Sequence, residues 1–86
     1  PIPEKFAAFG FNVIVIDEHD FDQIDAAFEA ARACKGKPTA IIQHSVKGKG
    51  VSFMENQVSW HGTAPNKEQY DQAMKELGET LTALEA

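Results

Sequence analysis

The sequence lacks the features that mark several large classes of protein. It has a single cysteine, Cys34, so no internal disulfide can form, and this fits a reducing, cytoplasmic setting. No apolar run approaches the roughly 20 residues of a membrane span, and the N-terminal residues carry no signal-peptide pattern. We therefore expect neither a membrane protein nor a disulfide-rich secreted domain.

Basic residues are also few. Eight lysines and arginines are outnumbered by thirteen aspartates and glutamates, and the net charge of −5 argues against nucleic acid as the main partner. The composition, 43% hydrophobic and 24% charged, is that of a globular chain. At 86 residues the chain suits one small domain or a piece of a larger one. Its start at Pro1, without a methionine, predicts a fragment or a processed product.

The first half of the chain predicts a strand, a helix and a second strand. A β-branched run over residues 12–17 indicates a buried strand. Helical periodicity follows over residues 21–34, with Asp20 as N-cap and Gln23 in the position that completes a capping box. A second strand is predicted over residues 39–46. Short links between these elements predict a βαβ unit with parallel strands and a right-handed crossover.

The flanking regions complete a predicted α/β fold. Residues 1–11 form an N-terminal segment that begins with prolines and contains three phenylalanines. No helix is predicted in this segment. A long loop covers residues 47–65, and Asn66 with Gln69 predicts the capped start of a final helix. An apolar stripe at helical spacing predicts that this helix packs on the sheet or on a larger body. The stripe consists of Tyr70, Ala73, Met74, Leu77, Leu81 and Leu84.

The long loop begins with the sequence KGKG, which has the chemistry of an anion site. Lys47 and Lys49 supply positive charge, while Gly48 and Gly50 can adopt positive φ and let backbone amides form an anion-binding concavity. The loop also follows a predicted parallel strand, which is where open α/β sheets bind ligands. The sequence nevertheless matches neither GxxxxGKS/T nor GxGxxG. Spacing alone favours a solvated basic loop over a phosphate cradle.

His61 is the most suggestive of the three histidines. Gly62 permits a tight backbone turn after it, and Trp60 can pack under the loop and orient the imidazole. A histidine so placed could donate to phosphate oxygens or exchange a proton with a substrate hydroxyl. From the local sequence alone, the favoured interpretation is that His61 is a loop histidine with no functional role. His19 and His44 are scattered, and no HxxxH or CxxC spacing indicates zinc.

Three stretches taken together resemble transketolase, in particular the N-terminal subunit of the split bacterial and archaeal transketolases. They are FGFNVIVIDEHD, KGKPTAIIQHSVKGKGVSFMEN and WHG, and the resemblance runs in order from about Phe6 to the final helix. It implies that residues 1–86 are the C-terminal portion of a three-layer domain that binds thiamine diphosphate.

The resemblance also implies an activity and a set of site residues. Transketolases of the pentose phosphate pathway use thiamine diphosphate and magnesium to transfer a two-carbon ketol unit from a ketose phosphate to an aldose phosphate. Lys47 matches a position near the diphosphate, and His61 matches a catalytic histidine that contacts the diphosphate and the substrate end of the cleft. Gly48, Gly50 and Gly62 are expected to shape the backbone at the cofactor.

Two features of the family that this chain does not contain predict its partners. The family's metal-binding GDG…N motif is absent, so we expect the magnesium ligands outside this chain. The glutamate that activates the aminopyrimidine belongs to another domain or polypeptide. We therefore expect three partners: the remaining segments of the diphosphate-binding domain, a pyrimidine-binding domain or subunit, and sugar phosphates. The assembly would be a dimer or heterotetramer, and the fragment alone would be inactive.

Two other interpretations stay open at this stage. The chain could belong to a related enzyme such as deoxyxylulose-phosphate synthase, or it could be a non-catalytic binding module derived from a thiamine-diphosphate enzyme. One position also departs from the family, because Glu18 stands where a glycine often precedes the His19-Asp20 pair. This substitution weakens the expectation of a tight turn there.

Overall fold

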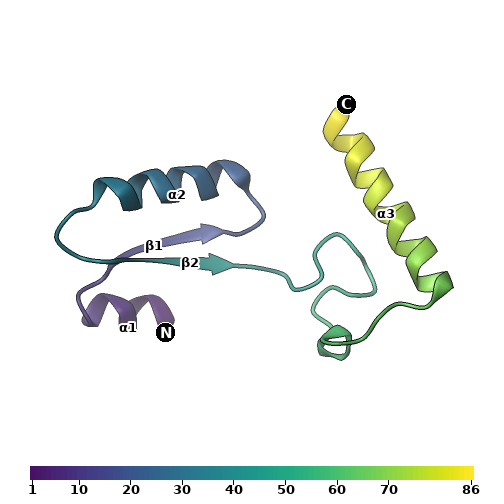
Figure 1. Ribbon diagram of the computed structural model, residues 1–86, viewed down its shortest axis with the longest axis horizontal. Helices are drawn as coiled ribbons and strands as arrows, with labels where there is room; N and C mark the ends of the chain where they lie inside the picture. Colours follow the sequence, from purple (N-terminus) through teal and green to yellow (C-terminus); the bar gives the residue numbers. More distant parts are fainter. The chain divides into compact units, whose positions relative to one another are not determined.

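The computed structural model describes residues 1–86, which form two compact units. The first, Pro1–Ser45, contains helix α1 (Ile2–Ala8), strand β1 (Asn12–Asp17), helix α2 (Phe21–Ala33) and strand β2 (Thr39–His44). The second, Val46–Ala86, contains a long loop, the 3-10 turn η1 (Val58–Trp60) and helix α3 (Lys67–Glu85) (Figure 1). None of the three α-helices combines the length and the apolar character needed to cross a bilayer.

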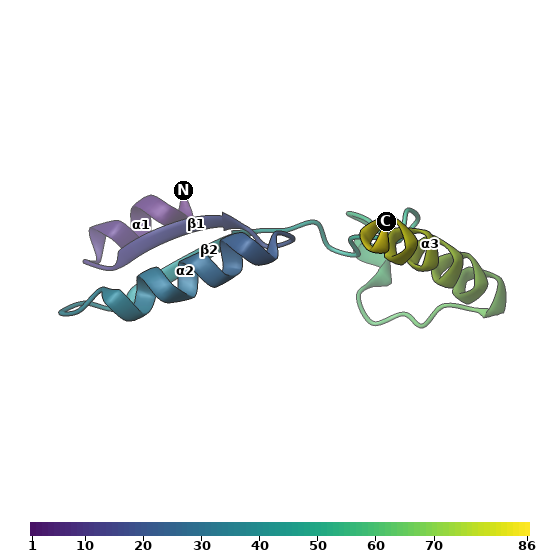
Figure 2. The same cartoon turned by 90° about the horizontal axis from the view of Figure 1, so that it is seen from above.

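Strands β1 and β2 pair in parallel, which confirms the predicted βαβ unit. The register runs from Asn12 opposite Thr39 to Asp17 opposite His44. Helix α2 makes the crossover, and α1 and α2 lie on opposite faces of the two strands (Figures 1 and 2). The first unit is therefore a small three-layer α/β arrangement, as predicted.

The second strand ends earlier than predicted, because its partner strand turns away. The prediction extended the strand to residue 46, whereas β2 stops at His44. The amide of Glu18 donates to the carbonyl of His44, at 2.9 Å, as the chain leaves β1. The amide of His19 then donates to Oδ1 of Asp17, at 2.9 Å, so a tight turn forms despite the glutamate at position 18.

Asp20 caps helix α2 as predicted, but Gln23 acts differently from the prediction. Oδ1 of Asp20 accepts hydrogen bonds from the amides of Asp22 and Gln23, at 2.9 and 3.1 Å. In a capping box the Gln23 side chain would accept from the Asp20 amide. Its Oε1 instead accepts from the Asp17 amide, at 2.8 Å, while its Nε2 donates to Asp20 Oδ2, at 3.1 Å. Gln23 thus ties the start of the helix to the end of β1.

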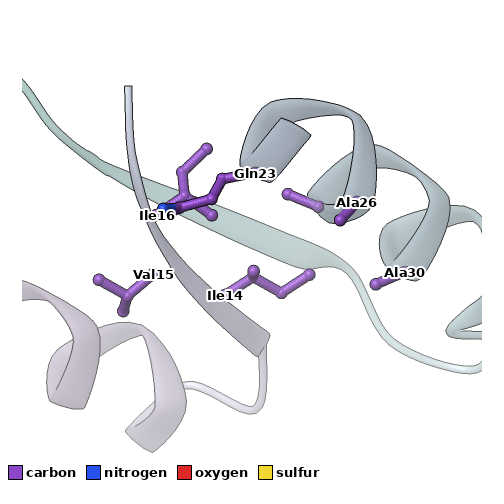
Figure 3. Close-up of a pocket in the computed structure, with 7 residues that line it drawn as sticks. Ile14, Val15, Ile16, Gln23, Ala26 and Ala30 are labelled. Carbon is purple, nitrogen blue, oxygen red and sulfur yellow. The ribbon is translucent and has the colours of Figure 1, made fainter. Parts of the chain in front are cut away.

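The core of the first unit is small and leaves apolar surface uncovered. Ile16 and Ala27 are its only buried hydrophobic residues. Ile14 and Ile16 point toward α2 and Val15 points the other way, as strand alternation requires (Figure 3). An apolar groove remains beside β1, and Val15 keeps 48% of its surface exposed. The groove is lined by Ile14, Val15, Ile16, Gln23, Ala26, Ala27 and Ala30.

Helix α1 was not predicted from the sequence. Its proline, Pro3, lies in the first turn, where a missing amide hydrogen leaves no intrahelical bond unmade. Gly10, with φ of +91°, follows the helix, and the rings of Phe6 and Phe11 meet edge to face at 5.1 Å. Phe9 does not join them, because 84% of its surface is exposed.

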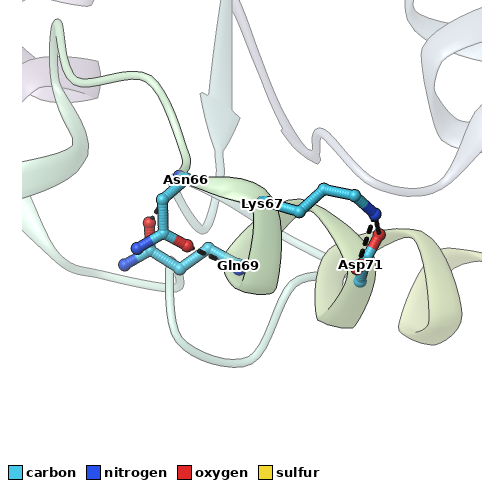
Figure 4. A network of polar contacts seen from close by, with 4 residues as sticks. All are labelled: Asn66, Lys67, Gln69 and Asp71. Carbon is cyan, nitrogen blue, oxygen red and sulfur yellow. Dashed lines mark hydrogen bonds and ion pairs between the residues drawn. The ribbon is translucent and has the colours of Figure 1, made fainter.

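Helix α3 begins at the predicted capping box. The amide of Gln69 donates to Asn66 Oδ1 at 2.9 Å, and Gln69 Oε1 accepts from the Asn66 amide at 2.8 Å (Figure 4). Lys67 Nζ also contacts both carboxylate oxygens of Asp71, at 2.6 and 2.7 Å, an exposed pair that contributes about 0.3–0.5 kcal/mol. Of the predicted apolar stripe only Ala73 is buried, so most of this face lies uncovered in the chain.

Candidate anion-binding site

Residues 47–56, which we name the lysine loop, form a closed structure at the start of the second unit. The amide of Asn56 donates to the carbonyl of Lys47, at 2.9 Å, and joins the two ends of the loop. Asn56 has φ of 57°, in the left-handed region that asparagine tolerates better than most residues. Val51 is buried and provides the loop with a small core. The loop is therefore internally braced.

Gly48 is required by both backbone conformation and space. Its φ is +79°, and a Cβ placed on it would lie 2.6 Å from the carbonyl oxygen of Met54. Gly50 has φ of +98°, and a Cβ there would lie 3.3 Å from Leu77 Cδ2. The predicted positive φ values are thus confirmed at both glycines. Gly48 also allows the two sides of the loop to come into backbone contact.

Four amides of the lysine loop are satisfied by carboxylates and carbonyls of the protein itself. The amide of Gly50 donates to Glu55 Oε1 at 3.1 Å, and the amide of Ser52 donates to Glu76 Oε1 at 2.8 Å. The amides of Lys49 and Val51 donate to backbone carbonyls at 3.1 and 3.2 Å. Because these four donors are satisfied within the protein, the positive charge that the loop offers comes from side chains.

Glu76 of α3 anchors the loop, and sequence reasoning did not identify it. Its carboxylate accepts from the amide and the hydroxyl of Ser52, at 2.8 and 3.0 Å, and from Gln72 Nε2 at 3.0 Å. The hydrogen bond from the Ser52 amide is the main cause that lowers the pKa of Glu76 below the ordinary value of 4.5. Ser52 and Glu76 are 24 positions apart, so no local sequence signal marks the pair.

Trp60 attaches the WHG stretch to the lysine loop, as the sequence predicted. Its indole Nε1 donates to the carbonyl of Phe53 at 3.1 Å, and the two rings lie 5.5 Å apart. The amide of His61 then donates to the carbonyl of Val58 at 3.0 Å, and Gly62 turns the chain with φ of +91°. These contacts hold the backbone of His61 beside the loop.

The structure brings Lys47 and His61 together. Lys47 Nζ lies 2.6 Å from His61 Nδ1, and both residues are exposed. They are the two residues that the sequence singled out for charge and for proton chemistry. Lys49 is exposed too. His19 and His44 belong to the first unit, and no group of three or more histidine, cysteine or acidic side chains could hold a metal ion.

Comparison with known proteins identifies the family of the chain. Residues 1–83 match the family described as transketolase, thiamine diphosphate binding domain. The chain belongs to this family. The resemblance of the three sequence stretches to transketolase is thereby confirmed.

Several curated relatives are similar over most of the chain. One of the subunits of the apulose-4-phosphate transketolase of Phocaeicola vulgatus is 35% identical over 82 residues, which are 95% of this chain and 29% of that protein. The 6-deoxy-6-sulfo-D-fructose transketolase subunit SqwG of a Clostridium species is 39% identical over 77 residues, 90% of this chain and 28% of that protein. Human transketolase is 37% identical over 74 residues, 86% of this chain and 11% of that protein. The chain therefore spans less than a third of the length of each of these relatives.

Proposed function

We propose that this chain is part of a transketolase that transfers a two-carbon ketol unit from a ketose phosphate to an aldose phosphate. The contact between Lys47, on the braced lysine loop, and His61 is the observation that carries this proposal, and both side chains are exposed. It lies inside the segment that matches the thiamine-diphosphate-binding family. A paired cation and imidazole suit both an anionic cofactor and sugar phosphates.

The donor groups of the pair fit a diphosphate. Lys47 keeps two further ammonium hydrogens beyond the one directed at His61, and the second ring nitrogen of His61 is available for another contact. Lys47 would bind the diphosphate, and His61, the proposed catalytic residue, would contact the diphosphate and the reacting end of the sugar. Gly48, Gly50 and Gly62 would shape the backbone of the site. Thiamine diphosphate, when bound, supplies the electron sink for breaking and forming the carbon–carbon bond.

The other walls of the site would come from other segments. The chain spans 28–29% of two relatives that are themselves named as subunits. Its uncovered apolar surface, including Phe9 and Phe21 at 84% exposure each, is typical of a piece that packs against more protein. We infer that residues 1–86 form the C-terminal portion of the diphosphate-binding domain. That domain would work with a pyrimidine-binding domain or subunit in a cytoplasmic dimer or heterotetramer, with the Mg²⁺ ligands outside this chain.

The names of the relatives support an anionic sugar as substrate. Apulose-4-phosphate carries a phosphate, and 6-deoxy-6-sulfo-D-fructose carries a sulfo group. A cationic loop suits either group, and a sugar phosphate is the substrate class that we propose. The reported relatives are transketolases or transketolase subunits, which favours this function over a deoxyxylulose-phosphate synthase.

The test is a calorimetric titration of thiamine diphosphate into the assembled enzyme that contains this chain. Replacing Lys47 by alanine should weaken cofactor binding by about 1–3 kcal/mol, because a charge-assisted contact is lost. Lys49→Ala, which removes the same charge from the same loop, should weaken it less. Equal cofactor affinity in the Lys47→Ala and wild-type enzymes would contradict the proposed site.

Measuring turnover distinguishes a catalytic transketolase from a non-catalytic binding module. The wild-type assembly should transfer a ketol unit between sugar phosphates, and His61→Ala should lower the turnover number while the unfolding midpoint stays close to that of the wild type. Cofactor binding without any ketol transfer would favour the non-catalytic module instead.

A further inference from the structure

The contact between Lys47 and His61 permits one hydrogen-bond assignment. The lysine ammonium carries three hydrogens and no acceptor, so it can only donate. His61 Nδ1, 2.6 Å from Lys47 Nζ, must therefore offer its lone pair. A neutral imidazole that accepts at Nδ1 carries its hydrogen at Nε2. A ring protonated at both nitrogens has no acceptor and would repel the ammonium group.

We propose that Lys47 is a positioning residue for His61, which it holds in the Nε2–H tautomer with that N–H directed away from Lys47. The proposed function enters this inference only through the identity of the ligand, since the tautomer follows from the contact itself. His61 is then a hydrogen-bond donor toward a ligand. Lys47 has two roles, because its remaining hydrogens stay available to the same ligand.

The pair as a whole presents donors and no free acceptor. Nε2–H of His61 and two ammonium hydrogens of Lys47 suit a ligand made of acceptor oxygens, such as the oxygens of a phosphate or diphosphate group. While the contact lasts, His61 has no lone pair with which to take a proton from a substrate. Its expected action in this arrangement is to donate a hydrogen bond and orient an anionic group, and proton uptake at Nδ1 would require the contact with Lys47 to open.

The backbone around the pair explains why the side chains meet. The carbonyl of Lys47 accepts from the Asn56 amide at 2.9 Å, which fixes the start of the lysine loop. The indole of Trp60 donates to the Phe53 carbonyl at 3.1 Å, which fixes the residue before His61. Both partners thus emerge from braced positions. Lys49 lies two residues further along the same loop and is a matched control for charge.

Nitrogen-15 NMR of histidine-labelled protein tests the tautomer without any ligand. In the wild-type protein, His61 should show hydrogen at Nε2 and an accepting Nδ1. Lys47→Met removes the ammonium and should increase the fraction of the Nδ1–H tautomer, whereas Lys49→Met should leave the His61 resonances unchanged. A wild-type ring protonated at Nδ1 would overturn the proposal, as would a Lys47→Met spectrum identical to that of the wild type.

Binding of inorganic pyrophosphate to the assembled enzyme tests the donor role. Glutamine at position 61 can place an amide nitrogen near the Nε2 position, whereas asparagine reaches only the Nδ1 position. His61→Gln should bind within a few fold of the wild type, and His61→Asn should bind about tenfold more weakly. Equal loss in both variants would overturn the donor role. If neither variant changes pyrophosphate affinity while the NMR result holds, the tautomer assignment stands and the proposed diphosphate site fails.

Discussion

Replacing Gly48 by alanine should destabilise the second unit more than a change of φ preference alone can do. A non-glycine residue at φ of +79° costs about 1–2 kcal/mol in the left-handed region. The new Cβ would also lie 2.6 Å from the Met54 carbonyl oxygen and 2.7 Å from its carbon, which are backbone atoms that cannot rotate away. Forcing such contacts costs a further 1–3 kcal/mol or so, which gives about 2–5 kcal/mol in total.

Gly62 provides the matched control for this prediction. Its φ of +91° is similarly positive, but a Cβ there would meet no atom within 4 Å. Gly62→Ala should therefore cost only about 1–2 kcal/mol, and the difference between the two variants measures the close approach at Met54. Equilibrium unfolding in urea gives both free energies, and the amide resonance of Met54 reports whether the loop has moved.

Equal losses in the free energy of unfolding in Gly48→Ala and Gly62→Ala would show that the close approach of Gly48 to Met54 costs nothing. So would an unshifted Met54 resonance in Gly48→Ala, because the methyl group cannot be accommodated unless the backbone shifts. If the loop does move, the Lys47 and His61 side chains should separate, and the NMR signature of the accepting Nδ1 should weaken in the same variant.

Three further predictions concern the helix cap and the braces of the loop. Asp20→Ala should lower the free energy of unfolding by about 0.5–2 kcal/mol in thermal denaturation, with Asp20→Asn near the wild type, since both side chains can cap a helix. Because the pKa of Glu76 is lowered in the folded state, its anchoring of Ser52 is present above pH 4.5 and is lost as the pH falls through the lowered value. The protection of the Ser52 amide against hydrogen exchange should fall over the same pH range, and it should be reduced at neutral pH in Glu76→Gln. Protection that changes neither with pH nor in this variant would show that Glu76 does not anchor Ser52. Trp60→Phe keeps a ring beside Phe53 but loses the indole hydrogen bond, so the free energy of unfolding should fall by about 0.5–1.5 kcal/mol, and an unchanged unfolding midpoint would show that this bond is dispensable.

The parts of the fold that were predictable depend on neighbouring residues. The bounds of β1 follow from a continuous β-branched run, and the starts of α2 and α3 follow from Asp20 and Asn66 with their short-range partners. The parallel pairing of β1 with β2 also follows, because two strands joined through a helix leave little choice of topology. Local chemistry and chain connectivity therefore account for most of the first unit.

The parts that were missed depend on how distant segments meet. Nothing near Ser52 indicates that its amide bonds to Glu76, and no local signal shows that carboxylates and carbonyls accept from four amides of the loop. The sequence marked Lys47 and His61 separately, but their contact depends on the course of the chain across a separation of 14 positions. Helix α1 was missed because prolines at its start resemble those of a loop, although the first turn of a helix accepts them.

A crystal structure of the assembled enzyme with bound thiamine diphosphate would show whether Lys47 and His61 bind the diphosphate. Lys47 Nζ should lie within hydrogen-bond distance of a diphosphate oxygen, about 2.7–3.2 Å, while its contact with His61 Nδ1 is kept. His61 Nε2 should face the diphosphate or the adjoining substrate end of the cleft. A diphosphate held entirely by other segments, with Lys47 and His61 outside hydrogen-bond distance, would rule out the proposed site.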